Sequence, residues 1–152
     1  MTSGSRLLAE YGTYHRDRRN LICHEIGIPL IVLGIVALLR LVHVWVPFLS
    51  TTLAGALLLA LILYYAAAFL RDNTAAVVIA TIGLAVIYVV SAYVTWPYAL
   101  GAFVVGWIFQ FIGHAYEGKS PAFLTNLLHL LVGPLWVASH LVPTSASSSS
   151  AR

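Results

Sequence analysis

Two stretches far apart in the chain hold the side chains best suited to chemistry. In one, an apolar segment ends with His114, and Glu117 follows three residues later. Residues three apart share a helix face, so an imidazole and a carboxylate lie together there. The other stretch holds His15, Asn20 and His24. Imidazoles and carboxylates bind metal ions or move protons, and the sequence predicts one of these chemistries.

The setting of these histidines favours function for some of them and ordinary roles for others. His24 and His114 border apolar segments, and ionisable groups within or beside membrane spans are functional by default. For His129 the ordinary alternative is a hydrogen bond to a neighbouring carbonyl. We interpret His43 and His140 as interfacial groups whose polar ends reach water.

His15 and His24 can serve one centre only if the chain bends between them. They are nine residues apart, which places them on opposite sides of a straight helix. We place the bend at residues 16–20. Asn20 and His24, four apart, then share a face, and Asn20 is a candidate to orient the His24 ring.

The composition is that of a membrane protein. Of 152 residues, 61% are hydrophobic and only 9% are charged, against roughly 45–50% and about 25% in soluble domains. The mean hydropathy is +0.92. The net charge of +3 therefore reports orientation in a bilayer and not binding to nucleic acid. A single cysteine, Cys23, excludes an intramolecular disulfide and a cysteine metal cluster.

The hydropathy pattern predicts an all-α, polytopic membrane helix bundle with about five hydrophobic spans. Residues 1–142 form one integral membrane domain, which includes an amphipathic, basic N-terminal segment at 1–24, and residues 143–152 form a flexible tail. The expected spans are residues 26–39, 52–70, 74–94, 99–114 and 122–141.

Several local signals refine these elements. Leu7, Leu8, Tyr11 and Tyr14 recur at helical spacing, which predicts a short amphipathic helix on the membrane surface.

Proline and polar residues mark the ends of the spans. Pro29 is expected in the first turn of the first span, and one of residues 72–74 is expected to cap the third span. Residues 96–98 read as an aromatic-rich interfacial turn. Pro134 should kink the fifth span.

The basic residues predict a cytoplasmic N-terminus. Six of the eight then lie inside and two outside, and the metal site lies on the cytoplasmic side. The inner set is Arg6, Arg16, Arg18, Arg19, Arg71 and Lys119, and the outer set is Arg40 and Arg152.

This topology gathers His15, His24, His114 and His129 at one membrane level. Histidines from separate helices commonly build a metal site within a bundle, and imidazole suits iron, zinc, copper and nickel. Glu117 has three open roles: a ligand, a carboxylate that orients a ligand, or a partner of Lys119.

Two motifs in this order resemble the small membrane family typified by the fungal 2-hydroxy fatty acid dioxygenase. The resemblance covers about residues 7 to 140. The motifs are His15-(x4)-Asn20-(x3)-His24-(x2)-Gly27-(x)-Pro29, and Gln110-(x2)-Gly113-His114 with Glu117 and Pro121-Ala122.

The resemblance implies an Fe(II)-dependent enzyme that converts a 2-hydroxy fatty acid and O₂ into a fatty acid one carbon shorter. It implies histidine ligands to the iron, with His15, His24 and His114 on matching motif positions. His129 is added on its placement alone. Asn20 and Glu117 are the candidate catalytic residues.

The same resemblance bears on substrate and location. A 2-hydroxy acid chelates iron through its carboxylate and hydroxyl, and Arg16, Arg18 and Arg19 are candidates to attract the carboxylate. The fungal enzyme serves phytosphingosine breakdown at the endoplasmic reticulum. For this chain we favour a bacterial inner membrane, or the endoplasmic reticulum membrane if the protein is eukaryotic.

Three other functions remain open. Another histidine-ligated membrane oxidase, hydroxylase or desaturase is one, although such enzymes usually carry denser HxxxH or HxxHH clusters. A small metal or proton transporter using His114, Glu117 and His129 is the second. A non-catalytic membrane scaffold is the third. The oligomeric state and the acyl chain length are not predicted.

Overall fold

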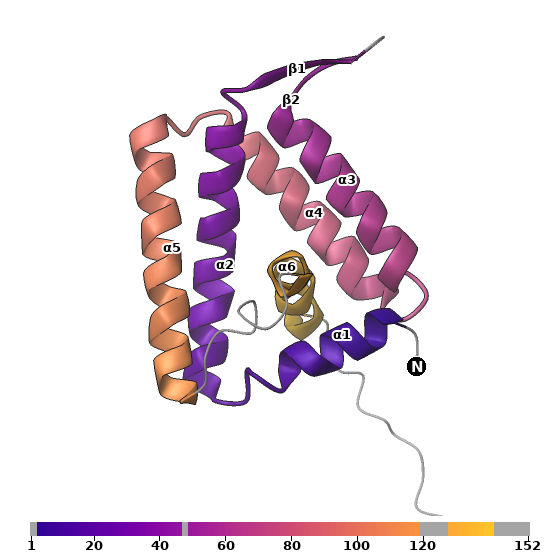
Figure 1. The fold of residues 1–152 in the computed structure, drawn as a ribbon, viewed down its shortest axis with the longest axis vertical. Helices are drawn as coiled ribbons and strands as arrows, with labels where there is room; N and C mark the ends of the chain where they lie inside the picture. The colour runs from indigo at the N-terminus through magenta and orange to yellow at the C-terminus, as the bar shows by residue number, and fades with distance from the viewer. Residues whose placement is uncertain (1–2, 47–48, 119–127, 142–152) are drawn as a thin grey trace, which may run out of the picture.

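The computed structural model describes residues 3–46, 49–118 and 128–141, and within them the protein is an all-α bundle with one small hairpin (Figure 1). This confirms the predicted fold class. The elements are α1 (Ser3–Gly12), α2 (Arg18–Leu39), β1 (His43–Val46), β2 (Leu49–Thr52), α3 (Leu53–Phe69), α4 (Thr74–Ser91), α5 (Trp96–Glu117) and α6 (Leu128–Leu141).

α2 and α5 run side by side and antiparallel (Figure 1). Glycines line the contact between them. A Cβ added to Gly106 would lie 2.8 Å from the Gly27 carbonyl oxygen, and one added to Gly113 would lie 2.9 Å from Cys23 Cβ. Small residues let two membrane helices approach closely. The two helices that carry His24 and His114 are therefore held together as one unit.

α3 and α4 form a helical hairpin that closes the other side of the bundle (Figure 1). Asn73 caps α4, because its Oδ1 accepts a hydrogen bond from the Ala76 amide at 3.0 Å. This matches the predicted cap region. Tyr65 and Phe69 of α3 are fully buried in the core.

α1 and α6 cross the bundle instead of lying parallel to α2. Figure 1 shows α6 end-on while α2 and α5 lie in the plane of the view, and α1 runs across the end of the bundle. The predicted amphipathic helix is present. Its apolar face packs on protein, since Tyr11 is only 5% exposed and lies in the core with Leu135 and Trp136.

Two local expectations differ from the structure. Residues 96–98 are not a turn, because α5 begins at Trp96 with Pro97 in its first turn, where the missing N–H costs nothing. Pro29 lies well inside α2, which starts earlier than predicted, at Arg18. α6 includes Pro134, and the kink expected there stays a prediction. The β1–β2 hairpin was not predicted, although its valines and threonines favour strands.

Three of the helices, α2, α4 and α5, are long and apolar enough to cross a membrane, which indicates a membrane protein. α3 and α6 are apolar but shorter over the residues described. The count of five spans therefore stays a prediction. Residues 122–127 of the expected fifth span and the tail at 143–152 lie outside the described residues.

Candidate metal centre

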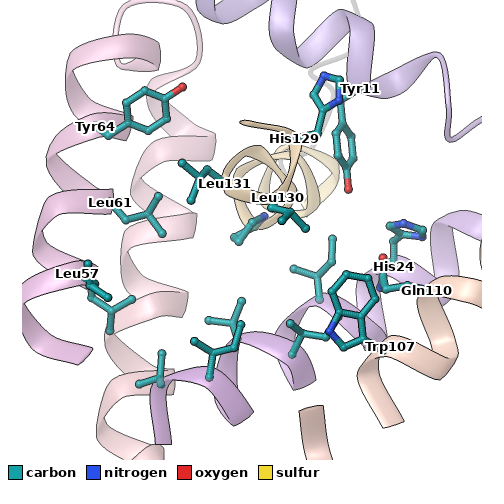
Figure 2. A pocket seen from close by; sticks show the side chains of 18 of the residues that line it. Tyr11, His24, Leu57, Leu61, Tyr64, Trp107, Gln110, His129, Leu130 and Leu131 are labelled. Carbon is teal, nitrogen blue, oxygen red and sulfur yellow. The ribbon is translucent and has the colours of Figure 1, made fainter. Parts of the chain in front are cut away.

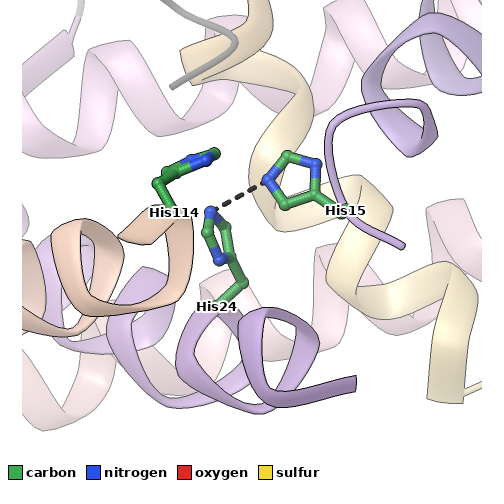
Figure 3. Close-up of side chains that lie close together, drawn as sticks. All are labelled: His15, His24 and His114. Atoms are coloured by element: carbon green, nitrogen blue, oxygen red, sulfur yellow. Dashed lines mark hydrogen bonds between the residues drawn. The ribbon is translucent and has the colours of Figure 1, made fainter. Parts of the chain in front are cut away.

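Three buried histidines from three segments meet at one end of the α2–α5 pair (Figure 3). His15 lies between α1 and α2, His24 on α2, and His114 on α5. Each offers a ring nitrogen within 4.8 Å of the other two. Their residues are 7%, 1% and 6% exposed, so the group is shielded from water.

Backbone carbonyls fix the tautomers of two of these rings. His15 Nδ1 lies 2.7 Å from the Tyr11 carbonyl oxygen, and His24 Nδ1 lies 3.0 Å from that of Asn20. A carbonyl only accepts, so each Nδ1 carries the proton. Each Nε2 then presents a lone pair, and the two Nε2 atoms face one another at 3.0 Å. In neutral rings this contact lacks a hydrogen between the two nitrogens.

A bound cation fits this arrangement. Metal-ligating histidines usually donate the other ring N–H to a carbonyl or carboxylate, which is the pattern of His15 and His24. Two nitrogen donors that bind one metal with bonds of about 2.1 Å cannot lie more than about 4.2 Å apart, and the 3.0 Å between the two Nε2 atoms meets this limit. In addition, the buried His114 Nδ1 has no hydrogen-bond partner among the described residues. The three imidazoles therefore form a suitable donor set.

The bend that brings His15 to His24 covers residues 13–17, so it overlaps the predicted segment, residues 16–20, only in part. α1 ends at Gly12, and Asp17 caps α2 by accepting a hydrogen bond from the Arg19 amide at 2.8 Å. The His15 ring stacks on Tyr11, with ring centres 4.3 Å apart. Burial lowers the pKa of His15 to about 4, so the ring is neutral and able to bind a metal at pH 7.

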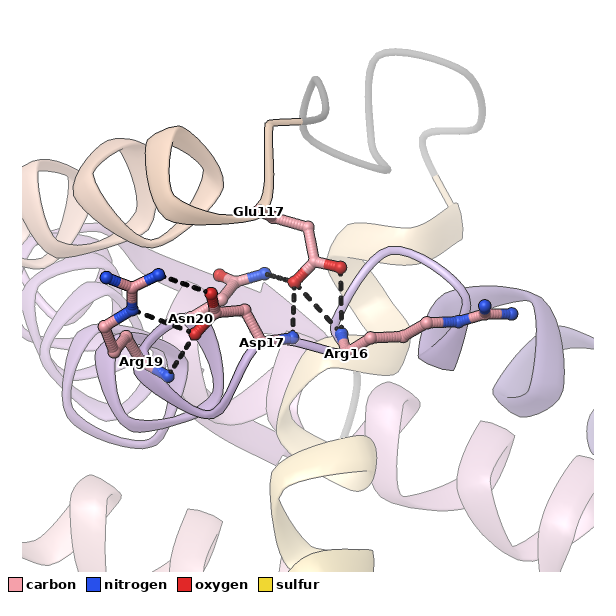
Figure 4. A network of polar contacts seen from close by, with 5 residues as sticks. All are labelled: Arg16, Asp17, Arg19, Asn20 and Glu117. Atoms are coloured by element: carbon pink, nitrogen blue, oxygen red, sulfur yellow. Dashed lines mark hydrogen bonds and ion pairs between the residues drawn. The ribbon is translucent and has the colours of Figure 1, made fainter.

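Glu117 fastens the segment that carries His15 to the end of α5 (Figure 4). Its carboxylate accepts hydrogen bonds from the backbone amides of Arg16, at 3.0 and 3.1 Å, and Asp17, at 2.8 Å. Asn20 Nδ2 donates a third, at 3.2 Å. We call these contacts the Glu117 network. The carboxylate is committed to amide donors and lies outside the histidine group.

Asn20 joins this network instead of orienting His24 through its side chain. Its Nδ2 donates to the Tyr14 carbonyl at 3.1 Å and to Glu117, while its own backbone carbonyl holds the His24 ring. The predicted link between Asn20 and His24 therefore exists, but through the main chain.

Comparison with known proteins adds to this geometry. Residues 1–144 match the protein family described as 2-hydroxy-palmitic acid dioxygenase Mpo1-like. The chain belongs to the Mpo1-like family. A relative from Saccharomyces cerevisiae, named 2-hydroxy-palmitic acid dioxygenase MPO1, is 32% identical over 127 residues, which cover 82% of this chain and 71% of the relative. No solved structure matches the chain.

The remaining predicted site residues surround the centre of this Mpo1-like chain without joining it. His129 is buried on α6, and its Nε2 lies 3.8 Å from a carboxylate oxygen of Glu10. Arg16 and Arg18 are exposed. Arg19 pairs with Asp17 at 2.8 Å and lies over the Tyr116 ring.

Two residues next to the centre had no predicted role. Gln110 is 6% exposed, and its Nε2 has no hydrogen-bond partner among the described residues. It lies four residues before His114 and so shares its helix face, a signal that the sequence carried. The centres of the Trp136 and His15 rings lie 4.8 Å apart. This contact joins distant segments, so no local sequence pattern predicts it.

Proposed function

We propose that the protein is an Fe(II)-dependent dioxygenase that shortens 2-hydroxy fatty acids by one carbon. Family membership and the yeast relative's name support the reaction class. The observation that carries the proposal is the convergence of three buried imidazoles at an apolar cavity lined by His15, His24 and His114. Such a cavity suits an acyl chain, and the imidazoles suit a redox-active metal.

His15, His24 and His114 would hold the iron. When bound, iron supplies Lewis-acid chelation of the substrate's carboxylate and 2-hydroxyl and the reactivity with O₂ that carbon-based side chains lack. Three protein ligands leave positions open for substrate and O₂. His129 is buried with its ring edge to face against Tyr11, and we propose that it lines the cavity without binding the metal.

The protein's own residues would prepare the site in three ways. The Tyr11 and Asn20 carbonyls hold two rings in the tautomer that leaves Nε2 free to bind. The Glu117 network holds the segment that carries His15. The exposed Arg16 and Arg18 would attract the substrate carboxylate toward this end of the bundle.

We further propose a multi-pass integral membrane protein with a cytoplasmic N-terminus and metal centre. The excess of basic residues near the N-terminus supports this orientation. A bacterial inner membrane is favoured, or the endoplasmic reticulum membrane in a eukaryote. A lipid bilayer setting would supply the fatty acid substrate directly.

The test is metal analysis and turnover on protein purified without oxygen. We expect bound iron, oxygen uptake with 2-hydroxypalmitate, and pentadecanoic acid as product. His24→Ala and His114→Ala should lose both iron and turnover while still inserting in the membrane. His43→Ala, a matched change at an exposed histidine of β1, should keep both. Full activity in either His24→Ala or His114→Ala would refute the ligand assignment.

A further inference from the structure

The three histidines of the metal centre line part of a large apolar cavity; Figure 2 shows this cavity with His24 labelled. Its volume is about 580 Å³, and its lining includes His24 at one end of α2 and Leu39 at the other. Leu57, Leu61 and Tyr64 of α3 face His24 and Trp107 across it in Figure 2. Along the described residues, no Asp, Glu, Lys or Arg lines it.

The length of this cavity matches a long acyl chain. His24 and Leu39 are 15 residues apart on α2, which corresponds to about 22 Å at the helical rise of about 1.5 Å per residue. A fully extended polypeptide advances about 3.6 Å over three bonds, or about 1.2 Å per bond. An extended acyl chain has a similar zigzag and advances about the same distance per carbon–carbon bond. The length of about 22 Å therefore accommodates about 18 such bonds.

The cavity lining farthest from the histidines along α2 and α3 includes Val36, Ala54 and Leu58, which we call the end wall, together with Leu39 and Leu57. Val36 lies near the end of α2, and Ala54 and Leu58 lie at the start of α3, where the hairpin joins the two helices (Figure 1). Val36 is 4% exposed and Ala54 is 1% exposed. The end of the cavity is therefore formed partly by packed side chains and partly by Leu57, which is 50% exposed.

We infer that this cavity binds the acyl chain of a long-chain 2-hydroxy acid with its head at the histidines, and that the end wall of Val36, Ala54 and Leu58 sets the longest chain accepted. Three features indicate this occupant: the cavity is continuous with the histidines, its lining is apolar, and its length fits a long acyl chain. The inference rests on the proposed function for the identity of the head group.

The test compares binding of 2-hydroxylaurate, 2-hydroxypalmitate and 2-hydroxyarachidate to the iron-loaded full chain without oxygen. Ala54→Leu fills the end of the cavity, so the longer two acids should weaken about tenfold or more relative to 2-hydroxylaurate. Leu58→Ala enlarges the end and should favour 2-hydroxyarachidate. Ala67→Leu is the matched control, since Ala67 is exposed on the same helix and outside the cavity.

The outcomes separate this inference from the proposed function. Equal binding of all three acids by the unsubstituted protein would overturn the inference, as would an unchanged profile in folded Leu58→Ala. Chain-length-dependent binding that shifts with these variants would support it, even if no acid caused oxygen uptake. In that last case the proposed function alone would fail.

A separate observation assigns a role to Gln110. Its buried Nε2 has no hydrogen-bond partner among the described residues, lines the cavity, and packs against Gly27, one turn along α2 from His24. A buried donor left unpaired is destabilising, so the place of Gln110 calls for an acceptor that arrives with the ligand. We propose that the Gln110 amide donates to the carboxylate of the bound 2-hydroxy acid.

Gln110→Leu and Gln110→Glu test this role. Leu removes the donor at similar size, and we expect KM for 2-hydroxypalmitate to rise about tenfold or more while the iron content stays unchanged. Because Leu also removes an unpaired buried amide, the substrate-free protein should become more stable. Glu places an anion beside the carboxylate and should weaken binding further. An unchanged KM in Gln110→Leu would overturn the assignment.

Discussion

Removal of the Glu117 carboxylate should loosen His15 before it affects any chemical step. In Glu117→Ala, the amides of Arg16 and Asp17 and the Asn20 side chain lose a charged acceptor. Hydrogen bonds to charged groups contribute about 1.5–3 kcal/mol each. Glu117 is partly exposed and Arg16 is exposed, so water replaces part of the loss. We expect the free energy of unfolding to fall by about 2–4 kcal/mol.

The same change should weaken iron binding, because the segment that carries His15 is no longer fastened to α5. Residues that orient metal ligands typically change metal affinity about 10–100-fold, and we expect a loss in that range. Competition with a ferrous chelator without oxygen measures the affinity. Glu117→Gln keeps one acceptor oxygen and should show a smaller loss. Glu25→Gln, a matched change on α2 outside the network, should leave the affinity unchanged.

Turnover at saturating iron decides between positioning and chemistry. If the Glu117 network only positions His15, kcat should recover as iron is raised. Glu117→Gln that binds iron fully yet cannot turn over would instead show that the carboxylate takes part in the reaction. Glu117→Ala with unchanged iron affinity and stability would refute the reasoning altogether.

Three further predictions concern the same end of the bundle. His129→Ala should bind as much iron as the unsubstituted protein. A lower iron content in this variant would show that His129 is a metal ligand. The iron-free protein should lose stability as pH falls from about 6.5 to about 4, because burial lowers the pKa of His15 to about 4 and the unfolded state binds more protons in this range. The free energy of unfolding, measured at several pH values, should fall by about 3 kcal/mol. A free energy of unfolding that does not change with pH would contradict this prediction. Gly113→Ala should lower iron affinity and stability, because its Cβ would lie 2.5 Å from Asn20 Oδ1 and overpacking costs about 1–3 kcal/mol. The control is Gly101→Ala, which has open space around it and should be neutral or stabilising in the same unfolding assay.

Local sequence signals predicted those parts of the fold that depend on neighbours in the chain. The bend between His15 and His24 follows from their spacing, and the cap at Asn73 follows from side-chain chemistry. The predicted turn at residues 96–98 is wrong, because proline is favoured both in turns and in the first turn of a helix. The long apolar run that follows Pro97 is the signal that favours the start of a helix over a turn.

Features that depend on distant contacts were beyond the sequence. The crosswise placement of α6 and the packing of Trp136 on His15 depend on tertiary structure. Glu117 was recognised as important, yet its partners are backbone amides of Arg16 and Asp17, which no side-chain pattern reveals. Gln110 stood in the second motif, but its role depends on a cavity formed by other helices.

The separation of the three histidines along the chain has a consequence for the metal-bound protein. His15 and His24 belong to the first segment, and His114 follows 90 residues after His24. An ion shared by all three is a cross-link that closes this long loop, and such closure removes conformational entropy from the unfolded chain. Chelation should therefore unfasten the N-terminal segment as well as stop turnover, and limited proteolysis after Arg16 would register the release.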